Sequence, residues 1–151
     1  MMQLALYRGP VGKPLDWRGL KAWGSHLAIC LRTLSRHSHA ELCINGTCYS
    51  ASVRDHGVRS KRIDLASGRW DVYALPGADE AAALAWFARH KGQHYDWPGI
   101  VAWVLPVRQH AQRWTCFEAV GAMLGLPRPH RLHARALKAW ALAQQPESAH
   151  A

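Results

Sequence analysis

The sequence has no long hydrophobic run. The apolar stretch from Trp97 to Val107 has eleven residues and contains two prolines, whereas a helix needs about 20 apolar residues to span a bilayer. The first residues, Met1 to Arg8, also lack the charged segment, apolar run and small-residue cleavage site of a secretory signal. We therefore expect no transmembrane segment and a cytoplasmic location.

Acidic residues are scarce. The chain has 10 Asp and Glu against 19 Lys and Arg, which gives a formal net charge of +9. Such an excess favours anionic partners, so one interpretation is a non-catalytic basic module that binds an anionic polymer or an envelope component. The charges do not interleave with aromatic residues as in a nucleic-acid platform, and an ordinary basic surface explains them as well. They fall into two main clusters: Arg54, Arg59, Lys61 and Arg62, then Arg128, Arg131, Arg135 and Lys138.

Cysteine is sparse and lacks the spacing of a metal site. The four cysteines are Cys30, Cys43, Cys48 and Cys116. They include no CxxC pair, so the common zinc-binding patterns are absent. His37 and His39 lie near two of them in sequence, which makes zinc a minor alternative, although the face of a hairpin explains the same residues. We expect no metal and no cofactor, and free thiols in a reducing cytosol.

The length and the order of the predicted elements indicate one α+β domain. With 151 residues, 49% of them hydrophobic, the chain can bury a core without disulfide or metal staples, and we expect a single domain over residues 1–151. The patterning predicts strands at residues 3–7 and 70–75 and a hairpin within 38–53. It predicts helices within 15–34, 79–92, 96–106, 115–124 and 131–144. This order favours an antiparallel sheet with helices packed around it.

The hairpin is the clearest local signal. Asn45-Gly46 separates two strand-like runs, and this dipeptide suits a type I′ turn because both turn residues need positive φ. A two-residue turn fixes the register, so side chains alternate between two faces. One face carries apolar side chains: Ala40, Leu42, Ile44, Tyr49 and Ala51. The other carries His39, Glu41, Cys43, Cys48, Ser50 and Ser52, for which an ordinary wet face is the plain alternative.

The same register places Cys43 opposite Cys48 as a non-hydrogen-bonded pair, where side chains approach most closely. The two thiols can form a cross-strand disulfide in an oxidising setting. The cytoplasmic expectation favours the reduced pair.

A second motif places a thiol at the start of a helix. Thr115 followed by Glu118 is a capping box, which makes Thr115 the N-cap and Cys116 the first helical residue. The positive end of the helix dipole and the unpaired backbone N–H groups favour a thiolate there. The alternative is a small buried hydrophobe at the start of an apolar helix. Together with a strand-borne histidine and a polar orienting group, the cysteine is placed like the nucleophile of a thiol hydrolase.

The chain resembles the circularly permuted papain-like amidases, which are related to the NlpC-type cell-wall peptidases and the lecithin retinol acyltransferase group. In these proteins the His strand precedes the Cys helix, the reverse of papain. The resemblance implies a permuted papain-like fold with Cys116 as nucleophile and His39 as base. The matching stretches are Ser38-His39-Ala40-Glu41-Leu42, Cys48-Tyr49-Ser50-Ala51, Tyr95-Asp96-Trp97 and Trp114-Thr115-Cys116-Phe117-Glu118-Ala119-Val120.

The third catalytic residue departs from this pattern. Members of the permuted group often carry an acidic residue where this chain has Ser50. The hairpin register puts Glu41 opposite Ser50, so we expect Glu41 as the third member and Ser50 as its hydrogen-bond partner. Ser52 faces His39 and is the competitor. Tyr95 resembles a tyrosine that lines the cleft in the wider superfamily, and a core aromatic residue is the alternative.

The sequence therefore predicts a cysteine-dependent hydrolase or acyltransferase that acts on an amide, peptide or ester bond. The substrate stays open between a peptide, a peptidoglycan stem and a lipid acyl group, and nothing indicates the oligomeric state. The basic binding module is the alternative. An enzyme needs the Cys116 sulfur beside a ring nitrogen of His39, whereas a binding module does not.

Overall fold

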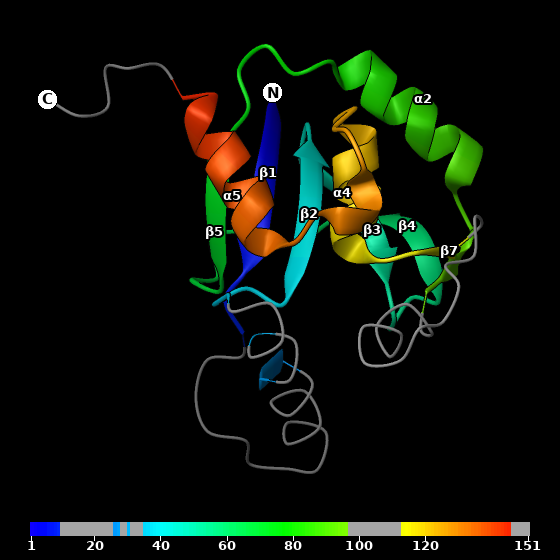
Figure 1. The fold of residues 1–151 in the computed structure, drawn as a ribbon, viewed down its shortest axis with the longest axis horizontal. Coiled ribbons are helices and arrows are strands. Elements are labelled where there is room, and N and C mark those ends of the chain that lie inside the picture. Colours follow the sequence, from blue (N-terminus) through cyan, green and yellow to red (C-terminus); the bar gives the residue numbers. More distant parts are fainter. Residues whose placement is uncertain (10–25, 28–29, 31–34, 97–112, 146–151) are drawn as a thin grey trace, which may run out of the picture.

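The fold is built on a mostly antiparallel sheet (Figure 1). The computed structural model describes residues 1–9, 26–27, 30, 35–96 and 113–145. Within these residues the strands follow the order β5-β1-β2-β3-β4-β6-β7, and only β6 and β7 are parallel. The α+β class is thereby confirmed. The strands are β1 (Met2–Tyr7), β2 (His39–Ile44), β3 (Thr47–Ser52), β4 (Gly57–Lys61), β5 (Trp70–Ala74), β6 (His94–Tyr95) and β7 (Arg113–Trp114).

The central hairpin forms as the sequence predicts. Asn45 has a φ of 49° and Gly46 a φ of 80°, the positive values that a type I′ turn requires. Leu42 pairs with Tyr49 and Cys43 with Cys48, which confirms the two-residue register. Strand β1 lies on the other side of β2, with Tyr7 opposite His39. The hairpin is therefore central in the sheet, and His39 is the first residue of its first strand.

Helix α2 (Glu80–His90) lies between β5 and β6, and helices α4 (Cys116–Met123) and α5 (Ala134–Ala143) follow β7; each of the three has a side-chain cap at its start. Helix α2 begins after Asp79, as predicted, and helix α4 begins after Thr115. Helix α5 begins later than predicted because the His133 ring accepts the N–H of Ala136 and caps it there. The residues just before it form a 3-10 turn, η1 (Pro129–Arg131). None of these helices is long and apolar enough to cross a membrane.

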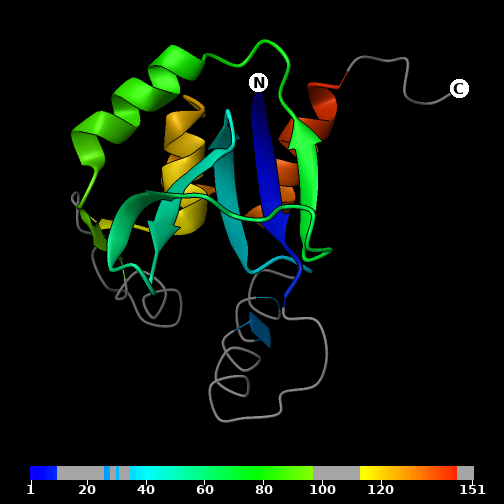
Figure 2. The ribbon, with the colours of Figure 1, turned by 180° about the vertical axis from the view of Figure 1, so that it is seen from behind.

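The core lies between the helices and one face of the sheet. Figures 1 and 2 show α4 and α5 on the same side of the strands. The apolar hairpin face is buried there, which confirms its predicted role. The phenyl ring of Phe87 on α2 meets the ring of Tyr49 at 4.8 Å between centroids. Fully buried members of this core include Leu4, Leu6, Leu42, Val120 and Leu137.

The opposite face of the sheet is buried as well, so the wet-face alternative is wrong for its central residues. The segment between β4 and β5 crosses over this face (Figure 2). Its residues Ile63 and Leu65, with Trp70, pack on a small cluster that contains Ala5 and the two hairpin cysteines. Glu41 and Ser50 on this face have no exposed surface. A polar row therefore runs through the interior of the protein.

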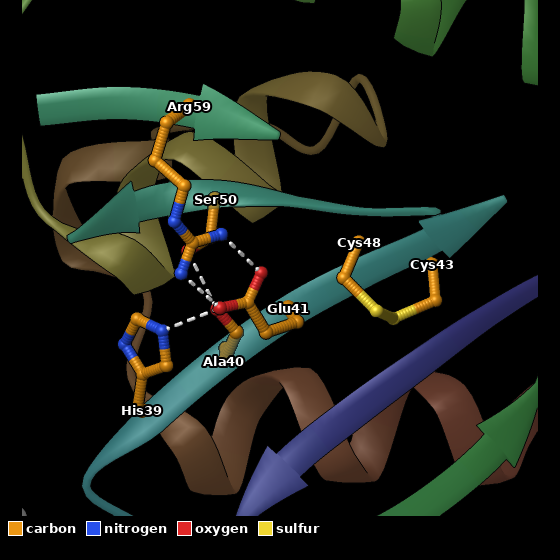
Figure 3. Close-up of a disulfide and its surroundings, with 7 residues drawn as sticks. All are labelled: His39, Ala40, Glu41, Cys43, Cys48, Ser50 and Arg59. Atoms are coloured by element: carbon orange, nitrogen blue, oxygen red, sulfur yellow. Dashed lines mark hydrogen bonds and ion pairs between the residues drawn. A yellow bond between two sulfur atoms is a disulfide. The ribbon is translucent and has the colours of Figure 1, made fainter. Parts of the chain in front are cut away.

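Cys43 and Cys48 form a disulfide, with 4.0 Å between their Cα atoms (Figure 3). This corrects the expectation of reduced thiols for two of the four cysteines. The register explains the bond, because the non-hydrogen-bonded position of an antiparallel pair brings side chains closest together.

Two predicted helices fall largely outside the described residues. These are the helix within residues 96–106, of which only Asp96 is described, and the helix within residues 15–34. Strands β4, β6 and β7 were not predicted. The two-residue strands β6 and β7 are too brief for a periodic signal. Strand β4 begins with glycine and ends with lysine, residue types that are depleted in strands.

Gly57 tests how tightly β4 and β6 approach. Its φ is +153°, and a Cβ there would lie 2.0 Å from the backbone oxygen of Gln93. We expect Gly57→Ala to lower the free energy of unfolding by about 2–3 kcal/mol through this overlap. Gly68, at φ +73° with open space around it, is the control, and Gly68→Ala should cost about 1 kcal/mol. Urea denaturation measures both, and equal losses would contradict the close approach.

Candidate active site

Cys116 lies at the start of α4, as the sequence predicts. The hydroxyl of Thr115 accepts the N–H of Glu118 at 3.3 Å, and the Glu118 carboxylate accepts the N–H of Thr115 at 3.3 Å. This completes the capping box. Cys116 is 3% exposed and occupies the positive end of the helix dipole, which stabilises a negative charge on sulfur.

His39 is in contact with this thiol. Burial by itself lowers the pKa of His39. The electrostatic attraction and side-chain hydrogen bond of Cys116, and then those of Glu41, outweigh it and raise the pKa to about 10. This interaction joins a residue on β2 to one on α4, and these two elements pack together in the core. The surroundings of His39 therefore favour the protonated imidazolium.

Glu41 holds the other side of the imidazole ring. Nε2 of His39 lies 2.8 Å from Oε1 of Glu41 (Figure 3), and the ring N–H donates because an ionised carboxylate only accepts. This leaves Nδ1 as the ring nitrogen for the thiol. The contact agrees with Glu41 as the predicted third member. It arises because residues two apart on a strand share a face.

Arg59 is the site residue that sequence reasoning missed. Its Nη1 donates to Oε2 of Glu41 at 2.7 Å, its Nη2 donates to Oε1, and its Nε donates to Asp55 at 2.8 Å. Burial raises the pKa of Glu41, but the hydrogen bonds from Arg59 and His39 outweigh it and lower that pKa below its usual value. Arg59 stands opposite Ser50 in the β3–β4 ladder. Extending the hairpin register by one strand would have placed it near Glu41.

Ser50 and Ser52 do not have the expected partners. The Ser50 hydroxyl donates to the backbone oxygen of Ala40 at 2.6 Å, and a hydroxyl has only one proton to donate. Ser50 is therefore a buried link between β2 and β3 and not the donor to Glu41. The Ser52 hydroxyl bonds to Asp55. The polar partners of His39 are Glu41 and Cys116 instead of Ser52.

Tyr95 lies against the thiol. Burial, followed by the charge and hydrogen bonding of Cys116, raises the pKa of Tyr95, while the backbone N–H of Cys116 acts in the opposite direction. Tyr95 belongs to β6 and pairs with Trp114 on β7, so it reaches the site from a strand. The phenol is protonated at neutral pH. It is a second polar side chain at the sulfur atom, in addition to the His39 ring.

The other free thiol has a different environment. Sγ of Cys30 lies 3.5 Å from Nε2 of His26, and Nδ1 of His26 lies 2.7 Å from the Ser38 hydroxyl. Burial raises the pKa of Cys30 and lowers that of His26. Burial therefore favours the neutral form of both groups, whereas the surroundings of His39 favour its protonated form.

The residues considered for zinc have other partners. Cys43 and Cys48 are bonded to each other, and His37 contacts Asp71 at 2.7 Å. Among the residues that the structure describes, no group of three or more His, Cys, Asp or Glu side chains could hold a metal ion.

Comparison of the chain with protein-family models, with curated proteins and with solved structures gave no match. The function is therefore inferred from the geometry of the site.

The protonation of His39 can be measured directly. Because its folded pKa is raised to about 10, the protonated His39 ring stabilises the fold, and this stabilisation is fully present below the ordinary His pKa of about 6.5. That stabilisation is lost as the pH rises through about 10. We expect Cys116→Ala to lower the His39 pKa by removing the largest favourable contribution, whereas Cys30→Ala leaves it unchanged. Long-range ¹H–¹⁵N NMR of the imidazole measures both. A His39 ring that titrates near its ordinary value in the parent protein would contradict the raised pKa.

Proposed function

We propose that the protein is a cysteine-dependent hydrolase or acyltransferase, with Cys116 as nucleophile, His39 as acid–base residue and Glu41 as the group that orients the ring. The observation that carries the proposal is the continuous contact from thiol to imidazole to buried carboxylate. A thiol activated by a base, with the base oriented by a third group, is the arrangement of nucleophilic acyl transfer.

The chemistry follows from these positions. The Cys116 thiolate attacks the carbonyl carbon of an amide or ester and forms a tetrahedral intermediate. Its oxyanion is stabilised by donors at the start of α4, beside which the Tyr95 phenol lies. The His39 imidazolium gives its proton to the leaving amine or alcohol as the carbon–heteroatom bond breaks. Neutral His39 then takes a proton from water, or from an acceptor alcohol or amine, which attacks the thioester and releases Cys116.

The order of the elements supports a permuted papain-like arrangement. His39 opens β2, and Cys116 opens α4 later in the chain. Helix α4 packs against the hairpin strands β2 and β3. The resemblance of the motifs and this packing are the two grounds for proposing a permuted papain-like fold. The proposed mechanism requires no cofactor.

The rival function is the basic module that binds an anionic polymer. It accounts for the net charge of +9 but needs no contact between Cys116 and His39. The interaction between these two residues, which come from distant parts of the chain, favours the enzyme.

The substrate is a carbonyl compound of the amide, peptide or ester class, and a peptide, a peptidoglycan stem and a lipid acyl group all fit this chemistry. The disulfide between the hairpin strands bears on the cellular location of the protein. A cytoplasmic protein would keep Cys43 and Cys48 reduced, whereas their disulfide favours an oxidising compartment.

Selective alkylation tests the nucleophile. We expect iodoacetamide near neutral pH to label Cys116 first, because its thiolate is paired with an imidazolium, and to label Cys30 slowly, because burial raises the pKa of that thiol. Peptide mapping by mass spectrometry gives both rates. His39→Ala should slow the labelling of Cys116 and leave that of Cys30 unchanged. Faster labelling of Cys30 in the parent would overturn the assignment.

The third member is tested by matched variants on the same face of the hairpin. We expect Glu41→Gln to reduce turnover of an activated ester by about a hundredfold or more, since the corresponding carboxylate of a serine triad contributes up to about 10⁴. Ser50→Ala and Ser52→Ala should keep turnover close to the parent value, because their hydroxyls bond to Ala40 and Asp55. Thermal melting confirms that each variant is folded. A folded Glu41→Gln protein with parental turnover would remove Glu41 from the mechanism.

A further inference from the structure

The guanidinium of Arg59 forms the largest set of polar contacts around the site. It donates to both oxygens of Glu41 and to one oxygen of Asp55. Its side chain is only 14% exposed and Glu41 is buried, so the contacts between these two residues are shielded from water. Figure 3 shows it reaching from β4 across β3 to the carboxylate on β2.

We propose that Arg59 is a positioning residue of the catalytic site, which acts through Glu41 on the imidazole of His39, and that Asp55 holds Arg59 in place. The inference rests on the proposed function of Cys116 and His39. It adds a fourth and a fifth residue, from β4 and from the turn before it, to the three residues that the chemistry requires.

The geometry makes Arg59 decisive for the orientation of Glu41. Oε1 of Glu41 accepts both from Nε2 of His39 and from Nη2 of Arg59, while Oε2 accepts from Nη1. A bidentate pair of this kind fixes the plane of a carboxylate as well as its position. With only His39 as a donor, the carboxylate could turn about its last torsion and move Oε1 away from the ring.

The electrostatics assign the same role. Glu41 is completely buried, and a buried carboxylate without a cation takes up a proton. Arg59 supplies a permanent positive charge that no change of pH removes. The charged groups that face this cluster are His39 on β2 and Asp55, together with Lys61, whose Nζ is 3.6 Å from Asp55. Cys116 and Tyr95 lie beyond the imidazole.

A lysine could not replace this arginine. An ammonium group is a point charge, whereas the guanidinium presents a planar fork that matches two carboxylate oxygens at once. Arg59→Lys would keep the charge near Glu41 and lose the bidentate contact, so it separates the two contributions.

The test is the pH dependence of Cys116 alkylation by iodoacetamide, which needs no substrate, combined with turnover of an activated ester. In Arg59→Gln, Glu41 becomes protonated at a higher pH, and the imidazolium loses its carboxylate partner. We expect the acid limb of both profiles to move up by about one to three pH units, the range by which one close cation shifts a carboxyl pKa. Arg59→Lys should give a smaller shift. Arg62→Gln, which removes an exposed cation just after β4, should give none.

Two further measurements make every outcome decisive. Circular dichroism and thermal melting identify variants that do not fold. If Arg59→Gln fails to fold, Arg59→Lys and Asp55→Asn decide, and both must shift the acid limb upward. Folded variants whose profiles superimpose on the parent, with lower melting temperatures alone, would show a purely structural role and overturn the proposal. Unexceptional Cys116 reactivity in the parent would instead overturn the proposed function, and this inference with it.

Discussion

The buried carboxylate of Glu41 is the group on which the rest of the site depends. Its side chain has no exposed surface, and an unpaired charge in that position would cost several kcal/mol. Arg59 and His39 prevent this by sharing its two oxygens. Because one oxygen is held from both sides, the plane of the imidazole is fixed, and with it the ring nitrogen that faces Cys116. In the proposed mechanism, the reactivity of the thiol therefore depends on an ion pair that the thiol does not touch.

The fold supplies the two remaining constraints, and each comes from a rigid element. The capping box holds the first turn of α4 with two hydrogen bonds, which fixes the backbone from which the Cys116 side chain projects. On the other side, the segment from β4 to β5 covers the sheet face that carries Glu41, and the indole of Trp70 packs edge-on against the His39 ring at 6.3 Å between centroids. The covering segment keeps Glu41 out of water, and in such an environment the same charges interact more strongly.

The parts of this arrangement that could be predicted from the sequence are those that depend on neighbouring residues. Asn45-Gly46 determines a turn within four residues, and Thr115 with Glu118 determines a helix start within one turn, so His39, Glu41 and Cys116 could all be identified. Arg59 could not be found in the same way, because its position depends on the pairing of a further strand. Ser50 was given the wrong partner for a related reason: a strand register fixes which Cα atoms are opposite, but not which acceptor a short hydroxyl reaches. The burial of the polar face also depended on a distant segment that carries no periodic pattern.

The strong positive charge of the chain and the chemistry of the site are separate properties. Groups of opposite charge lie side by side around the site: His39, Glu41, Arg59 and Asp55, with Lys61 3.6 Å from Asp55. Other exposed cations are Arg128, Arg131 and Arg135 around η1 and α5. A surface of this kind influences where a protein accumulates, whereas the buried pair of Glu41 and Arg59 acts on the orientation of the His39 ring. A basic surface is thus compatible with the catalytic function proposed above.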